Sequence, residues 1–268
     1  MDLILKYLTI NIKKEIQEYL KQNKEDIEEI RLRTLRPVVL KTSTKNILLE
    51  HIITSEELLE IFQKVCEHSI YSYQKQICEG FITINGGHRV GITGNCVIED
   101  GKIININYIS SLNFRIAREK KDVSEKILKF IVDKDGILNT LIASKPGCGK
   151  TTMLRDIVRK ISTGIPEYKS FPKTCGIVDE RGEIAAMYKG IAQNDIGILS
   201  DVIANTSKSD GMRMLIRSMA PDIIVCDEIG NKEDIEAISY AMCSGVKGIF
   251  TVHGNSFEEI IINPQIKE

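Results

Sequence analysis

The sequence predicts an α/β protein in which a smaller α+β domain precedes a parallel sheet with crossover helices. From residue 137 onward, short apolar runs alternate with helical segments, a pattern typical of parallel strands joined by helices. A glycine-rich turn separates the first of these runs from a helix, and two later runs end in pairs of carboxylates. Ligands of parallel sheets bind beyond the carboxyl ends of the strands, so we expect these features to meet at one edge.

The composition is that of an ordinary globular protein of 268 residues, with 43% hydrophobic and 27% charged residues. The formal net charge is −1, which argues against a large positive surface for binding nucleic acid. No apolar run is long enough to span a bilayer, so we expect no transmembrane segment in this sequence. The 7 cysteines form no C-x-x-C pair, which indicates reduced structural thiols in a cytosolic protein.

Residues 1–133 read as the α+β domain. Apolar residues recur at helical spacing through residues 3–20, and apolar and polar residues alternate through residues 27–33. Thr54 and Glu57 have the spacing of a capping box, which predicts a helix that follows them. Residues 80–117 are β-like, and the charged stretch 119–135 marks the domain boundary. The second domain is therefore predicted over residues 134–268.

Strands of the second domain are predicted over residues 138–143, 174–178, 222–226 and 248–252. The first strand leads through a glycine-rich loop into a helix over residues 153–161. The glycines allow consecutive backbone N–H groups to surround a phosphate, and the N-terminus of the helix adds a favourable dipole. The predicted phosphate-binding residues are Ser144, Lys145, Pro146, Gly147, Cys148, Gly149, Lys150, Thr151 and Thr152.

Four side chains have distinct predicted roles in the reaction. Lys150 would supply positive charge to the β- and γ-phosphates, and the Thr151 hydroxyl would reach Mg²⁺. Asp227 and Glu228 follow the strand at residues 222–226. We expect Asp227 to hold the Mg²⁺ shell and Glu228 to orient or deprotonate the attacking water. The sequence thus predicts a site for ATP and Mg²⁺.

Asp179, Glu180 and His253 end two further strands. The carboxylates of Asp179 and Glu180 are expected to face the γ-phosphate, with an acid-rich helix start as the alternative. His253 is expected to contact the γ-phosphate and to report its loss. The alternative for this histidine is an ordinary polar group with satisfied hydrogen bonds.

Two segments match GTPase motifs in residue type but not in their separation along the sequence. Residues 227–230 fit the pattern D-x-x-G and residues 231–234 fit N-K-x-D, but the two motifs adjoin. In GTPases one motif contacts the γ-phosphate and the other contacts the base, at opposite ends of the nucleotide. ATP is therefore the expected nucleotide.

Four segments resemble the stage III sporulation protein AA family: residues 143–157 (ASKPGCGKTTMLRDI), 177–186 (IVDERGEIAA), 211–230 (GMRMLIRSMAPDIIVCDEIG) and 251–254 (TVHG). That family is related to the ATPase motors of type II and type IV secretion and of pilus systems. The resemblance implies a RecA-like P-loop ATPase core that hydrolyses ATP during endospore formation. It also implies a homo-oligomeric, hexameric ring at the base of a channel of membrane-embedded sporulation proteins. Such an ATPase would be cytoplasmic, in the mother cell, and peripherally attached to the membrane complex.

The resemblance also assigns roles to individual residues. Asp179 and Glu180 match an acidic segment that assists the Mg²⁺–water site of secretion motors, and His253 matches a histidine motif near the end of the core. Arg217 matches an arginine that lies near the nucleotide. Arginines of the N-terminal domain commonly complete the site of a neighbouring subunit in these motors, and the candidates are Arg89, Arg115 and Arg118.

Two departures from the family pattern leave alternatives open. Family members carry glycine at the position of Ser144, and they continue for a few tens of residues beyond residues 264–268. We therefore expect a C-terminally truncated ATPase domain. The alternatives to a hydrolysing motor are a nucleic-acid-dependent RecA-like ATPase and a non-hydrolysing ATP-binding scaffold. The basic segment 31–41 contains no aromatic residue on which bases could stack, which disfavours the nucleic-acid alternative.

Overall fold

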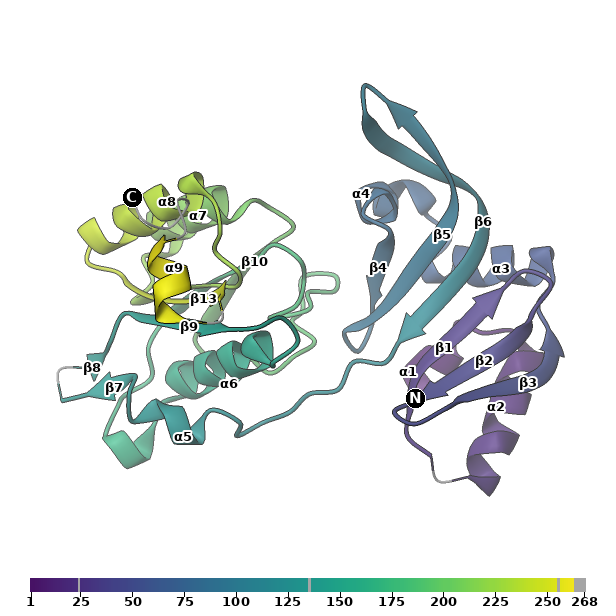
Figure 1. The fold of residues 1–268 in the computed structure, drawn as a ribbon, viewed down its shortest axis with the longest axis horizontal. Coiled ribbons are helices and arrows are strands. Elements are labelled where there is room, and N and C mark those ends of the chain that lie inside the picture. Colours follow the sequence, from purple (N-terminus) through teal and green to yellow (C-terminus); the bar gives the residue numbers. More distant parts are fainter. Residues whose placement is uncertain (24, 135, 255, 263–268) are drawn as a thin grey trace. The chain divides into compact units, whose positions relative to one another are not determined.

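A computed structural model describes residues 1–23, 25–134, 136–254 and 256–262, and it divides into two compact units (Figure 1). Unit 1 is Met1–Arg118 and unit 2 is Glu119–Glu268. No helix in these described ranges is long and apolar enough to cross a membrane. The expectation of a truncated domain concerns residues 264–268, which lie outside the described residues.

Unit 1 is built on a six-stranded antiparallel sheet with the strand order β3-β2-β1-β6-β5-β4 (Figure 1). Its strands are β1 (Ile27–Arg33), β2 (Pro37–Thr42), β3 (Asn46–Ile52), β4 (Phe81–Ile84), β5 (His88–Glu99) and β6 (Lys102–Arg115). Its helices are α1 (Asp2–Leu5), α2 (Ile10–Gln22), α3 (Ser55–Val65) and α4 (Gln74–Cys78), with a 3₁₀ turn η1 (Ile70–Tyr73).

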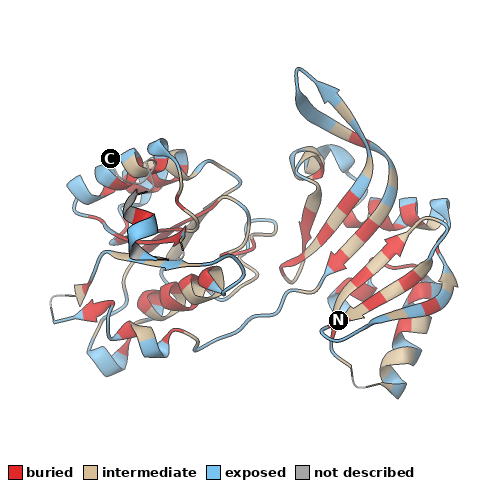
Figure 2. Ribbon diagram, in the orientation of Figure 1, coloured by how far each residue is buried: buried red, intermediate tan, exposed pale blue. Residues whose placement is uncertain are grey.

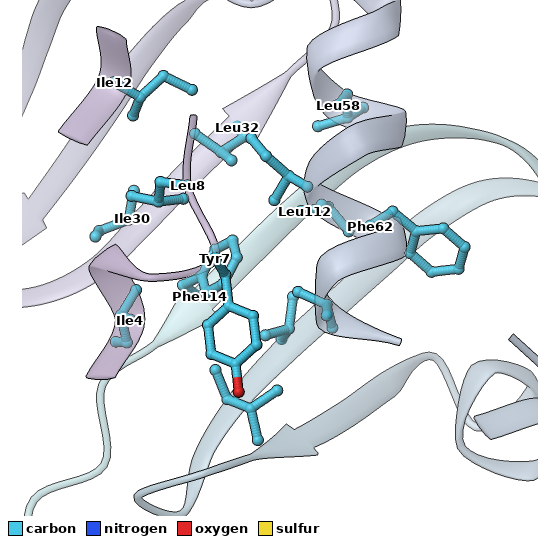
Figure 3. Packing of buried hydrophobic residues seen from close by; sticks show 14 of the residues in the cluster. Ile4, Tyr7, Leu8, Ile12, Ile30, Leu32, Leu58, Phe62, Leu112 and Phe114 are labelled. Atoms are coloured by element: carbon cyan, nitrogen blue, oxygen red, sulfur yellow. The ribbon is translucent and has the colours of Figure 1, made fainter. Parts of the chain in front are cut away.

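The core of unit 1 forms because strand side chains alternate between the two faces of the sheet. Along β2, buried and partly exposed residues alternate strictly (Figure 2). Leu32 of β1 is buried in one cluster with Leu58 and Phe62 of α3 (Figure 3). The Thr54 side chain accepts the N–H of Glu57, and the Glu57 carboxylate accepts the N–H of Thr54. The predicted capping box before α3 is therefore confirmed.

Unit 2 contains a five-stranded parallel sheet with the order β11-β10-β12-β13-β9. Its strands are β9 (Thr140–Ser144), β10 (Cys175–Asp179), β11 (Ser200–Ala204), β12 (Ile223–Cys226) and β13 (Lys247–His253). Its helices are α5 (Glu125–Leu128), α6 (Lys150–Thr163), α7 (Lys208–Met219), α8 (Lys232–Cys243) and α9 (Phe257–Ile262). A 3₁₀ turn η2 (Pro166–Tyr168) and a small antiparallel pair, β7 (Val132–Asp133) with β8 (Gly136–Ile137), complete the elements described.

Helices cover both faces of the parallel sheet. Residues of α6 pack with Ile177, Val225 and Ile249 on one face, whereas residues of α7 and α8 pack with Val178 and Ile224 on the other. Since successive strand residues point to opposite faces, every residue of β10 is buried. The predicted α/β class, with parallel strands and crossover helices, is confirmed.

β11 is a strand that the sequence did not predict. It pairs in parallel with β10 at the edge of the sheet, where Cys175 lies opposite Ser200 and Asp179 lies opposite Ala204. All of its residues are only partly buried, and the polar Ser200 and Asp201 leave it a short apolar run of residues 202–204. Its presence makes β10 an interior strand with neighbours on both sides.

The boundary between the units lies earlier than the sequence predicts, between Arg118 and Glu119 rather than after residue 133. Leu128 and Ile131 belong to the same buried cluster as Ile157 of α6. The charged stretch therefore folds as part of unit 2, because its few apolar side chains are buried against α6.

Asp156 of α6 fixes this stretch to unit 2. Its carboxylate accepts the N–H of Asp122 at 3.0 Å, the N–H of Ser124 at 2.9 Å and the hydroxyl of Ser124 at 2.6 Å. The Arg159 guanidinium lies 2.7 Å from the same carboxylate. Burial acts to raise the pKa of Asp156, but the bonds from Ser124, Arg159 and Asp122 outweigh it and lower that pKa to about 2.

We expect Asp156→Asn to lower the free energy of unfolding by about 2 kcal/mol at pH 7, because these bonds favour the ionised carboxylate. The folded-state pKa lies below the ordinary value of 3.8, so this stabilisation is complete above that value and disappears as the pH falls toward 2. Urea unfolding of both proteins at pH 7 and pH 3 measures the effect, with the exposed Glu167→Gln as the control. A stability difference that stays the same at both pH values would contradict this role for Asp156.

Candidate functional site

The predicted phosphate loop joins the end of β9 to the start of α6 and depends on two glycines. Gly147 and Gly149 have φ values of +75° and +85°, a left-handed conformation that glycine adopts without strain. Gly149 is the N-cap of α6, so the N–H groups of the first helical turn, which have no partner within the helix, lie at the loop. Such a loop and helix N-terminus form a suitable site for an anion.

Lys150 is nearly buried, at 7% exposure, and folds back onto the loop. Its Nζ lies 2.9 Å from the Ser144 carbonyl oxygen, 3.2 Å from that of Lys145 and 3.0 Å from Nδ1 of His253. An ammonium group only donates, so Nδ1 accepts, and the imidazole is neutral with its proton on Nε2. That Nε2 lies 2.8 Å from Oε1 of Glu228. One histidine therefore links the lysine of the phosphate loop to the glutamate that follows β12.

Asp227 lies between two threonine hydroxyls. Thr151 Oγ1 donates to one carboxylate oxygen and Thr251 Oγ1 donates to the other. Burial raises the pKa of Asp227; the two hydroxyl bonds oppose this effect, and the charges of Glu228 and Glu183 add to it. The Thr151 hydroxyl and the Asp227 carboxylate are adjacent hard oxygen ligands, and this pair fits Mg²⁺.

Glu228 is held on both sides of its carboxylate. Its Oε2 lies 2.8 Å from Nη1 of Arg181, and its Oε1 is the oxygen that accepts from His253. Its backbone N–H donates to Thr251 Oγ1 at 2.7 Å. Its φ of +52° is a left-handed conformation, which is strained for glutamate.

Asp179 and Glu180 line one small pocket with Asp227 and Glu228, but their carboxylates have different partners. Asp179 is buried, and its two oxygens accept four backbone N–H groups, from the residues of the loop at 183–186. All four distances lie between 2.7 and 3.2 Å. Its carboxylate therefore anchors that loop. Glu180 faces Lys208, whose Nζ lies 2.8 Å from its Oε2.

Arg217 does not lie at this edge of the sheet. α7 begins at Lys208, beside Glu180, and runs back toward the edge where β12 begins. Arg217 is exposed in the last turn of α7, roughly 13 Å along the helix axis from Lys208 at about 1.5 Å per residue. The position that the resemblance suggested for Arg217 is therefore not the one in this structure.

Three further residues of the site were not predicted from the sequence: Arg181, Lys208 and Thr251. Thr251 could have been found, because it lies two residues before His253 on the same strand and so shares its face. Arg181 directly follows Glu180, but nothing in the sequence indicates that it pairs with Glu228. Lys208 begins a helix that follows the unpredicted strand β11, so it could not be placed at this edge.

The whole chain, residues 1–268, matches the family described as sporulation stage III, protein AA. It is 38% identical over 267 residues to "Stage III sporulation protein AA" of Bacillus subtilis (strain 168), covering 100% of this chain and 86% of the relative. The chain belongs to the stage III sporulation protein AA family. The resemblance described from the sequence motifs is therefore confirmed.

Solved structures of secretion and pilus ATPases share the fold of this stage III sporulation protein AA family member. The Legionella pneumophila ATPase DotB matches with a TM-score of 0.58 and 16% identity, over 94% of this chain and 68% of that chain. The pilus retraction motor PilT matches with a TM-score of 0.61 and 16% identity, over 94% of this chain and 73% of that chain. The predicted RecA-like α/β core with a preceding N-terminal domain is confirmed by this likeness of fold.

We expect Asp227→Asn to leave the stability of the ligand-free protein unchanged or to raise it by up to about 1 kcal/mol. The pKa of Asp227 is raised in the folded state, so its negative charge lowers stability at neutral pH, and an amide removes that charge. The same change removes the Mg²⁺ ligand, so the rise in Tm on adding Mg²⁺ and ATP should be lost.

Thermal unfolding with and without Mg²⁺ and ATP measures both effects. The control is Glu236→Gln, which changes an exposed carboxylate of α8. An Asp227→Asn protein that gains as much Tm from Mg²⁺ and ATP as the wild type would contradict the assignment of Asp227 as the Mg²⁺ ligand.

Proposed function

We propose that this protein is a Mg²⁺-dependent ATPase motor that energises a mother-cell-to-forespore channel or secretion complex during endospore formation. One observation carries the proposal: Lys150, Thr151, Asp227, Glu228 and His253 converge at the carboxyl edge of the parallel sheet. These are the groups needed to bind a polyphosphate, hold a divalent cation and activate water. Membership of the sporulation family and the likeness of fold to DotB and to PilT, which was solved with bound ADP, support it.

The loop residues 144–152 bind the phosphates of ATP in this proposal. Lys150 exchanges its bonds to the carbonyls of Ser144 and Lys145 for bonds to phosphate oxygens. Its ammonium group therefore still donates as many hydrogen bonds as before. Thr151 and Asp227 would hold Mg²⁺, which would supply positive charge to neutralise the phosphates.

Glu228 is the general base of the proposed reaction. It takes a proton from water as the water oxygen bonds to the γ-phosphorus. The bond from that phosphorus to the β–γ bridging oxygen breaks, and ADP leaves with that oxygen. His253 loses its bond to Lys150 when the lysine turns to the phosphates, so it transmits occupancy of the loop to Glu228.

We further propose that the protein acts as a ring, a hexamer, in which unit 1 of one subunit completes the site of its neighbour. Arg89 and Arg115 lie directly opposite each other on β5 and β6. Arg115 is also in register with Glu29 of β1, and Arg89 lies over the Phe81 ring, so each arginine has a neighbour within unit 1. Arg118 binds Asp26 and the carbonyl of Ile27 within its own unit. Among the three arginine candidates, Arg115 is preferred, because its side chain is exposed at the end of β6.

The proposed partners follow from the family. The ring contacts membrane-embedded sporulation channel proteins, and the protein itself is cytoplasmic, in the mother cell, and peripheral to that complex. The net charge of −1 fits a motor that contacts proteins better than one that tracks nucleic acid.

We expect Mg²⁺-dependent ATP hydrolysis whose turnover per subunit rises with protein concentration, because the sites are shared between subunits. Lys150→Ala should abolish turnover by removing the charge on the β- and γ-phosphates. The matched control is Lys126→Ala, an exposed lysine of α5 outside the loop, which should keep most of the activity. ATP binding without any hydrolysis at high concentration would instead identify a nucleotide-binding scaffold, and hydrolysis stimulated by single-stranded DNA would identify a nucleic-acid-dependent ATPase.

Arg115→Ala should lower turnover about tenfold or more while leaving ATP binding intact, since the arginine acts on a neighbouring site. Mixing Arg115→Ala with Lys150→Ala should restore part of the activity. In mixed rings, some intact phosphate loops lie beside an intact Arg115. ATP hydrolysis measured against the mixing ratio tests this. Mixtures that stay as inactive as the separate variants would contradict a shared site.

A further inference from the structure

Lys208 is a buried cation at the edge of the sheet where the proposed site lies. It is the first residue of α7, and its side chain is 13% exposed. Its Nζ lies 2.8 Å from Oε2 of Glu180 and 3.9 Å from Oδ2 of Asp234, which is itself buried. It lines one small pocket together with Glu180, Asp227 and Glu228. Lys208 thus shares a pocket with the proposed general base.

The position of Lys208 is unfavourable for stability. A cation in the first turn of a helix opposes the helix dipole, and burial of an ammonium group costs hydration energy. Burial acts to lower the pKa of Lys208, but the bond to Glu180 and the charges of Glu180 and Asp234 outweigh it and raise that pKa. The lysine is therefore charged at neutral pH. The Glu180 side chain is 36% exposed, and ion pairs that are partly exposed contribute little net stability, so stability alone does not account for this one.

The pocket carries an excess of negative charge. Five carboxylates line it, from Asp179, Glu180, Glu183, Asp227 and Glu228, against two cations, Lys208 and Arg181. Asp179 is satisfied by backbone N–H groups, and Glu228 is held by Arg181 and His253. The salt bridge to Lys208 is the ion pair that neutralises Glu180. Without Lys208, a second carboxylate charge would stand unpaired beside Glu228, where the phosphates of ATP arrive.

The size of the pocket fits one water molecule. It offers about 20 Å³ to a water-sized sphere, and a cavity of roughly 10–15 Å³ by this measure is enough for one water. Its polar walls supply the hydrogen-bond partners that a buried water needs. A water held there would share the pocket with Glu228.

We propose that Lys208 is a positioning residue for ATP hydrolysis: it holds Glu180 in an ion pair, so that Glu228 alone takes the proton of the water in this pocket. This inference rests on the proposed ATPase activity. Two carboxylates of one pocket then have different roles because their partners differ, Glu180 with a buried lysine and Glu228 with a histidine and an exposed arginine.

The test compares Lys208→Met, Lys208→Arg and the double variant Lys208→Met/Glu180→Gln in Mg²⁺-dependent ATP hydrolysis. Lys208→Met should lower kcat at least tenfold with KM for ATP and binding of a fluorescent ATP analogue changed less than twofold. Lys208→Arg should keep most of kcat, because it preserves the ion pair. The double variant should recover most of the loss, because it removes the unpaired carboxylate as well as the lysine. Lys126→Met, at an exposed lysine of α5, controls for the change of residue type.

The possible results distinguish failure of this inference from failure of the proposed function. A wild-type protein without hydrolysis overturns the ATPase proposal, and the role of Lys208 falls with it. A hydrolysing wild type with normal kcat in Lys208→Met overturns only the role of Lys208. A double variant as inactive as Lys208→Met shows that the lysine does not act through Glu180. Should Lys208→Met fail to fold, Lys208→Arg and the double variant, which leave no unpaired buried charge, decide the question.

Discussion

The two hydroxyl bonds that the Asp227 carboxylate accepts hold the phosphate loop, β12 and β13 at one point. Thr151 comes from the first turn of α6, and Thr251 from β13. The buried Thr251 also accepts the N–H of Glu228, so the same contact sets the backbone of the proposed base. A carboxylate whose pKa is raised by burial needs hydrogen-bond donors or a cation. The Asp227 carboxylate, where a cation would fit, therefore also fixes the positions of the surrounding side chains.

The order of the strands makes this arrangement possible. β13 lies between β9 and β12, so the end of the strand that carries Thr251 and His253 separates the phosphate loop from the two acids. His253 pairs in register with Ser144, which places it directly beside the loop. All the strands of this sheet are parallel, so their carboxyl ends meet at one edge, as in other α/β proteins that bind ligands there.

Local patterns predicted those parts of the site that depend on neighbours in sequence. The loop from Ser144 to Thr152 and the acids Asp227 and Glu228 each follow a strand directly, so strand, turn and residue type could be read together. The pairing of Lys208 with Glu180 joins segments that meet only because β11 forms, and β11, with its short apolar run, was not predicted from the sequence. Arg217 is the opposite case. Its segment matches the family, but α7 runs away from the carboxyl edge of the sheet, so Arg217 lies far from the site. The earlier domain boundary likewise depends on contacts with α6 that the sequence does not show.

The hydrogen bonds of Lys150 explain how a ligand-free site stays ordered without its phosphates. Three acceptors hold the ammonium group, two carbonyls of the loop and Nδ1 of His253, so a buried cation is satisfied without an anion. A phosphate that takes over this lysine leaves Nδ1 of His253 without its donor while Nε2 still binds Glu228. The imidazole must then accept from a new donor or rotate, and rotation breaks its bond to Glu228. In the proposed function, occupancy of the loop would thereby be coupled to the position of Glu228 through His253.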